Sequence, residues 1–425
     1  MIPAPKVYYH GTERNTLKTI CSRRALEYSE TENDSHQYAI IDLRVAIDEL
    51  KSLEDWKKLR QVVFVMCSQL FAELEDRRFI TVIAKNRFFL NDYHPIAWDL
   101  GYLVSSVFSL KDEKIGCITS AHSYSKILPQ NGGQETFYVL NFRKDEKSPN
   151  SQTLLDYPYS SVKSVTLDVD IPQWFILKPQ RRNKDEILHP AKYPEDLVEM
   201  YVSVFTKPGD NVFDPMSGTG STQVAAIKLG RNGYGTELSE FFGKIAQNRC
   251  REAIEPVQGS LFPQQINATA EIIISDARDF KKHSFPKQNY LITSPPYWDM
   301  LNMKGAENQS KRNQSGLRTN YSEDEQDMGN ISDYKYFLDS VVTLYRDLSD
   351  LLMKGSKVTL VVKNIKKKGD NYPFAWDLCR ELQGSYLLLP EGFWLQDDIS
   401  IAPFGYGNTW VSNTFHQYCL NFQKL

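Results

Sequence analysis

The segment that decides the fold is Asn211–Gly230, which reads NVFDPMSGTGSTQVAAIKLG. It begins with an apolar, strand-like run, passes through a turn containing Gly218 and Gly220, and continues as a helical pattern. Glycines at a strand-to-helix turn let the backbone approach a ligand closely, and the first turn of a helix favours polar or anionic ligand groups. The segment therefore predicts a strand, a ligand-binding turn and a helix. The plainer alternative is an ordinary glycine-rich turn.

The same alternation continues along the chain. Strand-like runs at 232–238 and 270–276 are separated by a helical pattern at 240–254. Three more strand candidates follow, at 290–293, 357–364 and 416–422. Alternating strands and helices are typical of a parallel sheet with crossover helices. We therefore expect an α/β fold whose mostly parallel sheet is flanked by helices.

Acidic residues end three successive strand candidates. Asp214 ends the first and can accept from an amino or cationic group. Glu237 ends the second, about twenty residues on, where an acidic side chain commonly holds ribose hydroxyls. Asp276 ends the third and is expected at the edge of an adenine. Together with the glycine turn, these positions favour a nucleoside-containing ligand.

The fourth strand candidate stops at Ser294-Pro295-Pro296-Tyr297. Proline supplies no N–H, so the carbonyls and the hydroxyl here find no sheet partner and can accept hydrogen bonds from an amino group. Tyr297 offers a flat face on which a base can stack. Acceptors for an exocyclic amino group beside a donor of methyl groups are what methylation of an extruded base requires.

Three motifs carry a resemblance to a known family. FDPMSGTG at 213–220, TSPPYW at 293–298 and LHPAKYPEDLVEMYVSVFTKPGD at 188–210 occur together. The chain thereby resembles the S-adenosylmethionine-dependent amino-methyltransferases that modify DNA at N4 of cytosine or N6 of adenine. The resemblance covers roughly residues 170–425 and implies a Rossmann-like methyltransferase fold.

The resemblance also implies roles for individual residues. The target base would be held by Ser294, Pro295, Pro296 and Tyr297. S-adenosylmethionine would be bound by Phe213, Asp214, Pro215, Ser217, Gly218, Gly220, Thr222, Glu237, Asp276, Thr293, Lys192 and Tyr193.

The first residue of the Ser-Pro-Pro-Tyr tetrad bears on which base is methylated. In this family serine is more often associated with N4 of cytosine, and aspartate with N6 of adenine, so N4-cytosine is the expected target and N6-adenine the alternative. A serine hydroxyl is not a strong base, so we expect the proton to leave to water after methyl transfer. Methylation at carbon 5 of cytosine needs a cysteine nucleophile, usually after proline, and none of the six cysteines follows one.

Two functions of other classes stay open. Related tetrads serve RNA and protein-amide methyltransferases, and the chain could be a nucleic-acid-binding relic without activity. An Asp or Asn in place of Ser294 would have favoured the first. The intact cofactor motif argues against the second.

The chain also contains an internal repeat. Residues 77–100 can be laid over 355–378 without a gap, at a constant offset of 278 positions, so that Lys85-Asn86 meets Lys363-Asn364 and Trp98 meets Trp376. Continued backwards across the segment 301–331, most of which the first copy lacks, the overlay sets Asp42-Leu43-Arg44-Val45 against the Ser-Pro-Pro-Tyr tetrad. We interpret residues 1–150 as a degenerate duplicate of the catalytic half, with a role in DNA recognition or as a scaffold.

This interpretation divides the chain. Residues 151–425 would form the catalytic domain, with a cofactor half at about 185–285 and a catalytic half at about 286–425. The strands after Tyr290 should complete the cofactor sheet, and the first segment should form a separate half-sheet. The strand at 81–86 should not lie beside Phe213. Trp98 and Trp376 are expected in the core, and Lys363 and Asn364 at the catalytic rim.

The expected partner is double-stranded DNA, with a cognate restriction endonuclease in a restriction–modification system. Phosphate contacts are expected from six basic residues of two polar segments: Lys304, Lys311, Arg312, Arg318, Arg181 and Arg182. No apolar run reaches the roughly 20 residues that span a bilayer, and the N-terminus lacks a signal-peptide core, which favours a cytoplasmic protein. The scattered cysteines predict no metal site.

Overall fold

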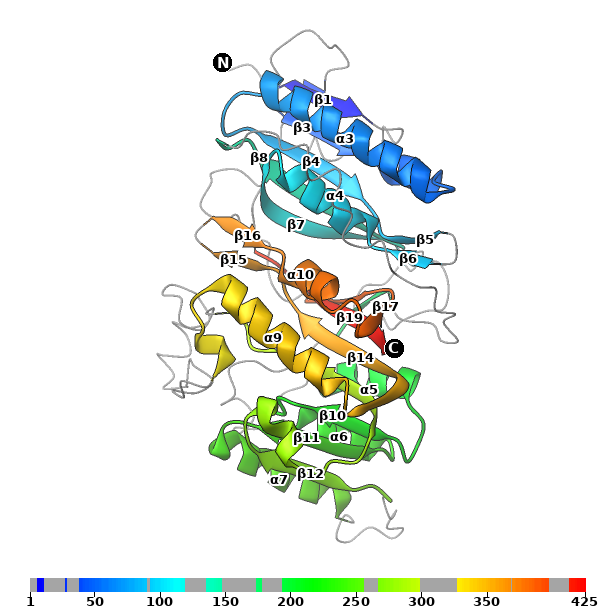
Figure 1. Cartoon of the computed structure of the whole chain (residues 1–425), viewed down its shortest axis with the longest axis vertical. Helices are drawn as coiled ribbons and strands as arrows, with labels where there is room; N and C mark the ends of the chain where they lie inside the picture. Colours follow the sequence, from blue (N-terminus) through cyan, green and yellow to red (C-terminus); the bar gives the residue numbers. More distant parts are fainter. Residues whose placement is uncertain are drawn as a thin grey trace.

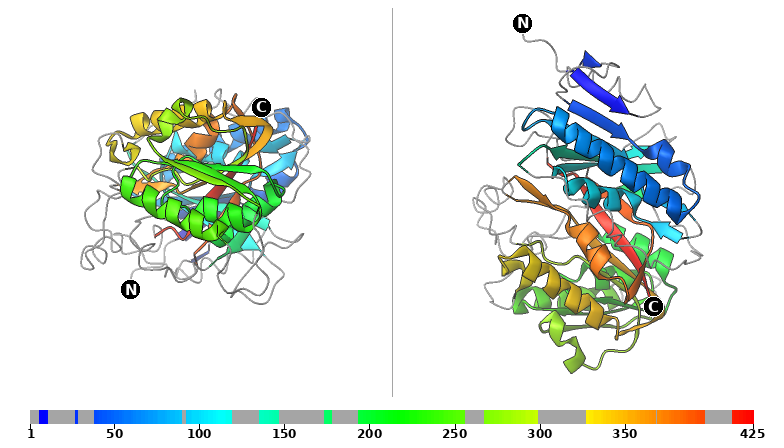
Figure 2. Two further views of the ribbon diagram at one scale, coloured as in Figure 1. Left: turned by 90° about the horizontal axis from the view of Figure 1, so that it is seen from below. Right: turned by 45° about the horizontal axis from the view of Figure 1, so that its top comes forward.

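A computed structural model gives the structure of the chain. It describes residues 6–10, 27–28, 38–89, 92–118, 135–146, 173–177, 193–255, 267–298, 327–367, 369–396 and 413–425. Two sheets follow one another along the long axis of the molecule (Figures 1 and 2). We call the part built on strands β1–β8 the first lobe and the part built on β9–β19 the second lobe.

The second lobe contains a nine-stranded sheet in the order β12-β11-β10-β13-β14-β19-β18-β9, with β17 also pairing with β19. Its strands are β9 (Trp174–Ile176), β10 (Asn211–Asp214), β11 (Asn232–Glu237), β12 (Ala270–Ile274), β13 (Gln288–Thr293), β14 (Leu352–Val362), β17 (Tyr386–Leu388), β18 (Gly392–Leu395) and β19 (His416–Lys424). Strands β12 to β14 run parallel, and β19 is antiparallel to both β14 and β18. The α/β fold with a mostly parallel sheet is confirmed.

Helices cover both faces of this sheet. They are α5 (Glu195–Phe205), α6 (Ser221–Lys228), α7 (Glu240–Ile254), α9 (Tyr334–Leu348) and α10 (Phe374–Glu381), with the short helices η3 (Ala277–Lys282) and η4 (Met328–Asn330). The two faces follow from the alternation of strand side chains. Val212 and Tyr290 pack with α5 and α6, whereas Phe213 and Leu291 pack with α9 and α10. Strands buried on both sides explain the continuous apolar runs in the sequence.

The first lobe has a six-stranded sheet in the order β2-β1-β3-β4-β8-β7. Its strands are β1 (Lys6–His10), β2 (Glu27–Tyr28), β3 (Tyr38–Asp42), β4 (Phe79–Ala84), β7 (Ser109–Ile118) and β8 (Glu135–Arg143), and its helices are α2 (Arg44–Asp48), α3 (Leu53–Glu73) and α4 (Ile96–Ser105). The strand containing Thr81 therefore lies outside the β10 sheet, and the strands after Tyr290 extend that sheet, in the arrangement expected from the sequence.

The two lobes share a pattern of strands. The order β3-β4-β8-β7 has the same parallel and antiparallel pairs as β13-β14-β19-β18. Each set also carries a two-stranded hairpin after its second strand: β5 (Arg87–Phe89) with β6 (Asp92–His94), and β15 (Ile365–Lys367) with β16 (Asp370–Tyr372). These correspondences fit the sequence repeat. A duplication as their origin stays a prediction, as do the domain boundaries, because 147–172 lie outside the described residues.

The lobes are joined by one hydrophobic core. Trp98 and Trp376 are both fully buried in it, as the sequence predicts. The ring of Trp376 lies so close to Gly101 of α4 that a Cβ atom there would come within 2.5 Å of it. A glycine at this position therefore lets the second lobe insert an indole against the first. Helices α3, α4, α10 and α9 follow one another along one side of the molecule (Figure 1).

Candidate active site

The centre of the site is Asp214, which ends β10 and is only 1% exposed. Its Oδ1 accepts from the hydroxyl of Thr293 (2.6 Å) and the N–H of Met216 (2.9 Å). Its Oδ2 accepts from the hydroxyls of Thr222 (2.6 Å) and Tyr193 (2.8 Å). Burial raises the pKa of Asp214, and these hydrogen bonds act in the opposite direction.

The four donors on Asp214 come from four separate segments: the residues before α5, the turn after β10, α6 and β13. The structure thus brings together four residues that the sequence assigns to the cofactor site, namely Tyr193, Asp214, Thr222 and Thr293. Two donors on each oxygen fill the ordinary acceptor capacity of a carboxylate. Asp214 is therefore better placed to hold the turn in shape than to take a further donor from a ligand.

The turn itself is shaped by glycines. Gly218 and Gly220 have positive φ angles of 53° and 80°, and Gly220 is the N-cap residue of α6. Gly235, on β11, is needed for a different reason: a Cβ atom there would lie 2.3 Å from both the carbonyl oxygen of Asp214 and Oγ of Ser217. The side chain of Gln223 donates to that Oγ at 2.9 Å.

Gly235 and Gln223 were missed by sequence reasoning. The only signal for Gly235 was the alternating glycines of Asn232–Glu237, and Gln223 lies in a helix that gives no sign of its partner.

Glu237, at the end of β11, also faces the turn. Its Oε2 accepts from the N–H of Gly218 at 2.8 Å, and its Oε1 accepts from the N–H of Ser239 at 2.9 Å. Burial raises the pKa of Glu237 to about 7, against the effect of these two bonds. Each oxygen keeps acceptor capacity, so the side chain is suited to hold a pair of hydroxyls.

Asp276 lies at the end of β12, as expected, but it is engaged by a neighbour. Its Oδ1 accepts from the backbone N–H (2.8 Å) and Nε (2.9 Å) of Arg278, whose guanidinium also forms an ion pair with Oδ2. Burial alone would raise the pKa of Asp276, but these contacts with Arg278 outweigh it and lower the pKa. A ligand amino group would share this carboxylate with an arginine, which the sequence did not suggest.

The Ser-Pro-Pro-Tyr tetrad follows β13 directly and lies next to the cofactor turn, because β13 pairs with β10. The hydroxyl of Ser294 donates to the carbonyl oxygen of Val361 on β14 at 2.9 Å. Its proton is thereby committed, and its oxygen can only accept a further hydrogen bond. The Tyr297 hydroxyl donates to Oε1 of Gln417 on β19 at 3.0 Å, which fixes the ring. Burial raises the pKa of Tyr297 to about 12.

Trp298, the next residue, is a packing anchor. Its Nε1 donates to the carbonyl oxygen of Ser332 at 3.2 Å, and its buried ring makes edge contacts with Tyr334 and Tyr372. The ammonium of Lys367 lies 3.8 Å from the ring centroid. These contacts give Trp298 a structural role in the core.

Lys363 lies just beyond the end of β14, two residues after the carbonyl that holds Ser294. Its ammonium donates to Oε1 of Gln396 at 3.2 Å and, among the described residues, forms no ion pair. Burial lowers the pKa of Lys363 to about 8. The corresponding Lys85 of the first lobe differs, because Asp48 and Glu135 each lie 2.8 Å from its ammonium. A cation at the rim that no carboxylate of the described residues neutralises is suited to an anionic ligand group.

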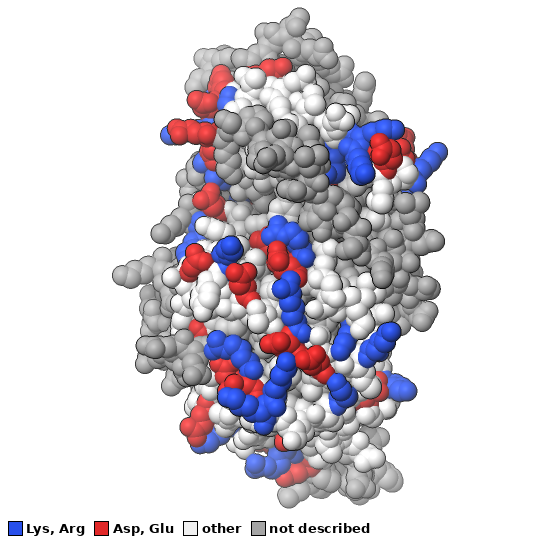
Figure 3. All heavy atoms as spheres, viewed as in Figure 1, with Lys and Arg blue, Asp and Glu red and all other residues white. Residues whose placement is uncertain are grey.

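Several sequence predictions fall outside the residues that the structure describes: Lys192 of the cofactor set and all six basic residues assigned to DNA, Lys304, Lys311, Arg312, Arg318, Arg181 and Arg182. On the face shown in Figure 3, the described Lys and Arg side chains are interspersed with Asp and Glu. That face therefore gives no single-sign patch from which a DNA path could be drawn. The DNA contacts stay predictions.

Comparison with known proteins gives the family. The family of N6/N4 methyltransferases, described as DNA methylase, matches residues 31–248, which is just over half of the chain. The chain belongs to this family of DNA methylases. S-adenosylmethionine is accordingly its cofactor, as the sequence predicts. The match begins in the first lobe and ends in α7, before the tetrad, whereas the sequence motifs placed the resemblance at roughly 170–425.

Individual relatives agree with the family. The type II methyltransferase M.BglII of Bacillus subtilis is 33% identical over 90 residues, which are 21% of this chain and 24% of that protein. M.MthZI of Methanothermobacter thermautotrophicus is 28% identical over 159 residues, 35% of this chain and 44% of that protein. The matched part thus spans less than half the length of either relative.

Distant likenesses to solved structures also exist. TrmN from Thermus thermophilus covers 68% of this chain and 57% of its own, with 14% identity and a TM-score of 0.34. Magnesium protoporphyrin IX methyltransferase from Synechocystis PCC 6803 with bound SAH covers 54% of this chain and 81% of its own, with 14% identity and a TM-score of 0.32.

Within the described ranges, no cluster of three or more His, Cys, Asp or Glu side chains could hold a metal ion. No helix in those ranges has the length and apolar character needed to cross a bilayer.

Proposed function

We propose that this protein is a DNA methyltransferase that transfers the methyl group of S-adenosylmethionine to the exocyclic amino group of a flipped base, with N4 of cytosine as the target. The observation that carries the proposal is the adjacency of the two motifs. The cofactor turn follows β10, the tetrad follows the neighbouring parallel strand β13, and the Thr293–Asp214 hydrogen bond joins them. A ligand at the turn and a base at the tetrad would therefore meet at one edge of the sheet.

The cofactor site fits the donor. Gly218 and Gly220 give the turn its positive φ angles, Gly235 leaves room for it beside β11, and Glu237 presents carboxylate oxygens for the ribose. When bound, S-adenosylmethionine supplies an electrophilic methyl group. The chain's own residues orient the acceptor.

The tetrad would present the amino group of the base. Ser294 has only acceptor capacity left, so its oxygen would take one N–H of the base and fix the direction of the nitrogen lone pair. The ring of Tyr297, anchored through Gln417, would stack on the base. Neither Ser294 nor Tyr297 is a strong base. The amino proton would therefore leave to water after methyl transfer.

Serine at the head of the tetrad favours N4 of cytosine over N6 of adenine, which remains the second candidate. The relatives named type II methyltransferases suggest that the protein works in restriction–modification beside a cognate endonuclease.

The test is a methyl-transfer assay with tritiated S-adenosylmethionine on unmethylated genomic DNA, followed by mass spectrometry of the nucleosides. We expect N4-methylcytosine. N6-methyladenine would correct the base, and label in RNA alone would reject the DNA substrate.

A further inference from the structure

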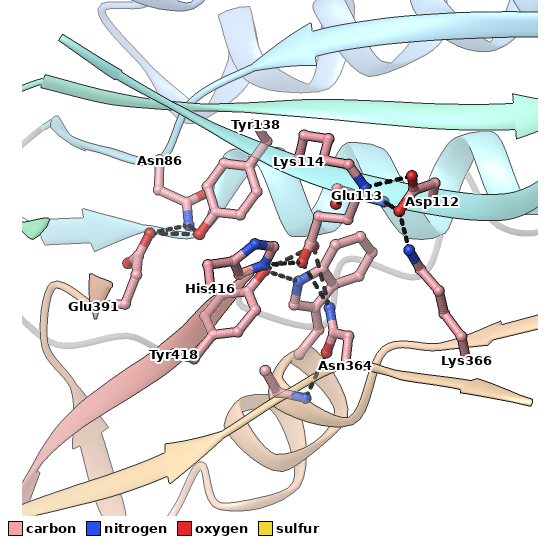
Figure 4. A network of polar contacts seen from close by, with 12 residues as sticks. Asn86, Asp112, Glu113, Lys114, Tyr138, Asn364, Lys366, Glu391, His416 and Tyr418 are labelled. Atoms are coloured by element: carbon pink, nitrogen blue, oxygen red, sulfur yellow. Dashed lines mark hydrogen bonds and ion pairs between the residues drawn. The ribbon is translucent and has the colours of Figure 1, made fainter. Parts of the chain in front are cut away.

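Each lobe places one buried carboxylate among hydrogen-bond donors of the other lobe (Figure 4). Glu113, on β7 of the first lobe, reaches into the second lobe, where it accepts from Tyr418 (2.7 Å), His416 (3.0 Å) and Asn364 (3.1 Å). All of these groups are buried. The first lobe therefore supplies an acceptor to β19 and to the segment between β14 and β15.

The second lobe returns the same contact. Glu391, just before β18, accepts from Tyr138 (2.6 Å), Asn86 (3.0 Å) and Tyr93 of the first lobe. Glu391 stands 278 positions after Glu113, the offset that also relates Asn364 to Asn86. The strand registers give the same equivalence: Lys114 on β7 pairs with Val139, and Gly392 on β18 pairs with the corresponding Cys419, so the residues before them, Glu113 and Glu391, occupy equivalent positions.

Reciprocal contacts of this kind define an isologous interface, in which residue i of one unit meets residue j of the other and the reverse. A corresponding pair also lies against itself: the rings of Tyr138 and Tyr418 stack with centroids 6.5 Å apart and planes 24° apart. Equivalent residues meet only near a two-fold axis. The lobes thus pack as the two subunits of a symmetric dimer would.

The exchange is not symmetric in its consequence, because only the second lobe has the tetrad. His416 is followed by Gln417, which holds the hydroxyl of Tyr297. Asn364 follows Lys363 and lies three residues after Val361, whose carbonyl holds Ser294. Glu113 therefore contacts β19 next to Gln417 and the segment just after β14, which are the two places that hold the tetrad.

From this geometry we propose that the first lobe acts as a built-in, catalytically silent second subunit, and that Glu113 is a positioning residue for the base-binding tetrad. It acts through β19 on Tyr297 and through the end of β14 on Ser294. This inference rests on the proposed function, because its effect is read in methyl transfer.

The pseudo-symmetry supplies a matched control. Glu113→Gln and Glu391→Gln each turn one oxygen of a buried, multiply bonded carboxylate into a donor that faces donors. Both variants should lose a similar amount of stability, since each carboxylate is buried and accepts from one Tyr, one Asn and one further ring donor, His416 for Glu113 and Tyr93 for Glu391. We expect Glu113→Gln to lower kcat at least tenfold with little change in the Kd for S-adenosylhomocysteine. Glu391→Gln should stay within about twofold of the wild type in kcat.

A milder pair guards against misfolding. Tyr418→Phe and Tyr138→Phe each remove one hydroxyl donor from Glu113 and Glu391, and the first should lower kcat more than the second. Equal losses of kcat within each pair would overturn the positioning role and leave Glu113 as an ordinary interface residue. An unchanged kcat in Glu113→Gln would overturn it as well.

Failure of the proposed function can be distinguished from failure of the positioning role of Glu113. Absence of methyl transfer by the wild-type chain would reject the function itself. In that case hydrogen–deuterium exchange decides the contact: Glu113→Gln should speed exchange in β19 and Glu391→Gln in β8. Exchange that is unchanged in both strands would overturn the inference.

Discussion

The hydroxyl of Thr293 donates to Oδ1 of Asp214 over 2.6 Å, and this one bond joins the strand that leads into the tetrad to the strand that leads into the cofactor turn. Both residues are buried, so the bond is shielded from water. The relative position of a bound cofactor and a target base depends on how rigidly these two strand ends are held.

Replacing Thr293 with Val should therefore weaken cofactor binding as well as stability. The change leaves Asp214 one donor short in a buried site, which costs about 1–3 kcal/mol of unfolding free energy. Urea unfolding and calorimetric titration with S-adenosylhomocysteine measure the two effects. Thr359→Val is the control, since Thr359 is equally buried on β14 but bonds to Asn421. It should lose stability and keep its affinity; equal affinities in the two variants would contradict the prediction.

Tyr297 should matter most for its ring and less for its hydroxyl. Tyr297→Ala removes the stacking face and should slow methyl transfer by about 5- to 150-fold, because base–aromatic stacking contributes about 1–3 kcal/mol. Tyr297→Phe keeps the face but loses the bond to Gln417 that fixes it, so its activity should fall between those of the wild type and Tyr297→Ala. Steady-state kinetics on DNA, with cofactor affinity measured beside them, separate the two variants. Loss of cofactor binding in Tyr297→Ala would show that the ring serves another ligand.

Affinity for the cofactor product should depend on pH near neutrality. Burial raises the pKa of Glu237 from its usual 4.5 to about 7, so below that pH the carboxyl carries a proton and is a poorer acceptor for ribose hydroxyls. Binding of S-adenosylhomocysteine should strengthen as the pH rises through about 7 and then level off. Glu237→Gln should bind more weakly, without this rise. A Glu237 variant that keeps the full pH dependence would disprove the assignment.

The same shift has the opposite effect on the stability of the free protein. Between pH 4.5 and about 7 the folded chain holds a proton on Glu237 that the unfolded chain has lost, so this residue's contribution to stability falls as the pH rises. The difference in unfolding free energy between wild type and Glu237→Gln, measured across that window, isolates the contribution. A difference that does not vary with pH would contradict the raised pKa.

Lys363 should contribute one cationic contact to DNA binding. Lys363→Ala should weaken binding and reduce the slope of log K against log salt concentration by about 1. Lys85→Ala is the matched control, because Asp48 and Glu135 already neutralise that lysine. Its slope should equal that of the wild type. Fluorescence anisotropy at several salt concentrations gives both slopes, and an unchanged slope for Lys363→Ala would remove Lys363 from the DNA interface.

Much of the second lobe could be predicted from the sequence because its signals are local. The strand, glycine turn and helix at 211–230, and the tetrad at the end of its neighbouring strand, are short motifs whose chemistry depends on adjacent residues. The bonds that connect Asp214 to Tyr193 and Thr293 could not be predicted, since they join segments far apart in the chain. Asp276 was assigned to the adenine edge only because it follows a strand. The sequence did not show that Arg278, two residues later, contacts both oxygens of the Asp276 carboxylate.

The repeat was visible in the sequence, but its spatial meaning was not. An offset of 278 positions says that two segments are alike and is silent on how they meet. The exchange of Glu113 and Glu391 depends on how the two sheets face each other, which no periodicity encodes. The family match runs from the first lobe through the cofactor turn and ends before the tetrad. Sequence typical of the family is therefore also present outside the catalytic half.

Because the two lobes belong to one chain, a mutation can change one lobe without changing the other. In a homodimer every substitution appears twice, so a residue near the axis must suit both surroundings at once. Here each position can drift alone. Beside Glu113 stands Asp112, buried and bonded to Lys114 and Lys366, whereas the matching place beside Glu391 is Pro390. A chain built in this way can specialise one half for support while selection keeps the other for chemistry, without ever losing its partner to dilution.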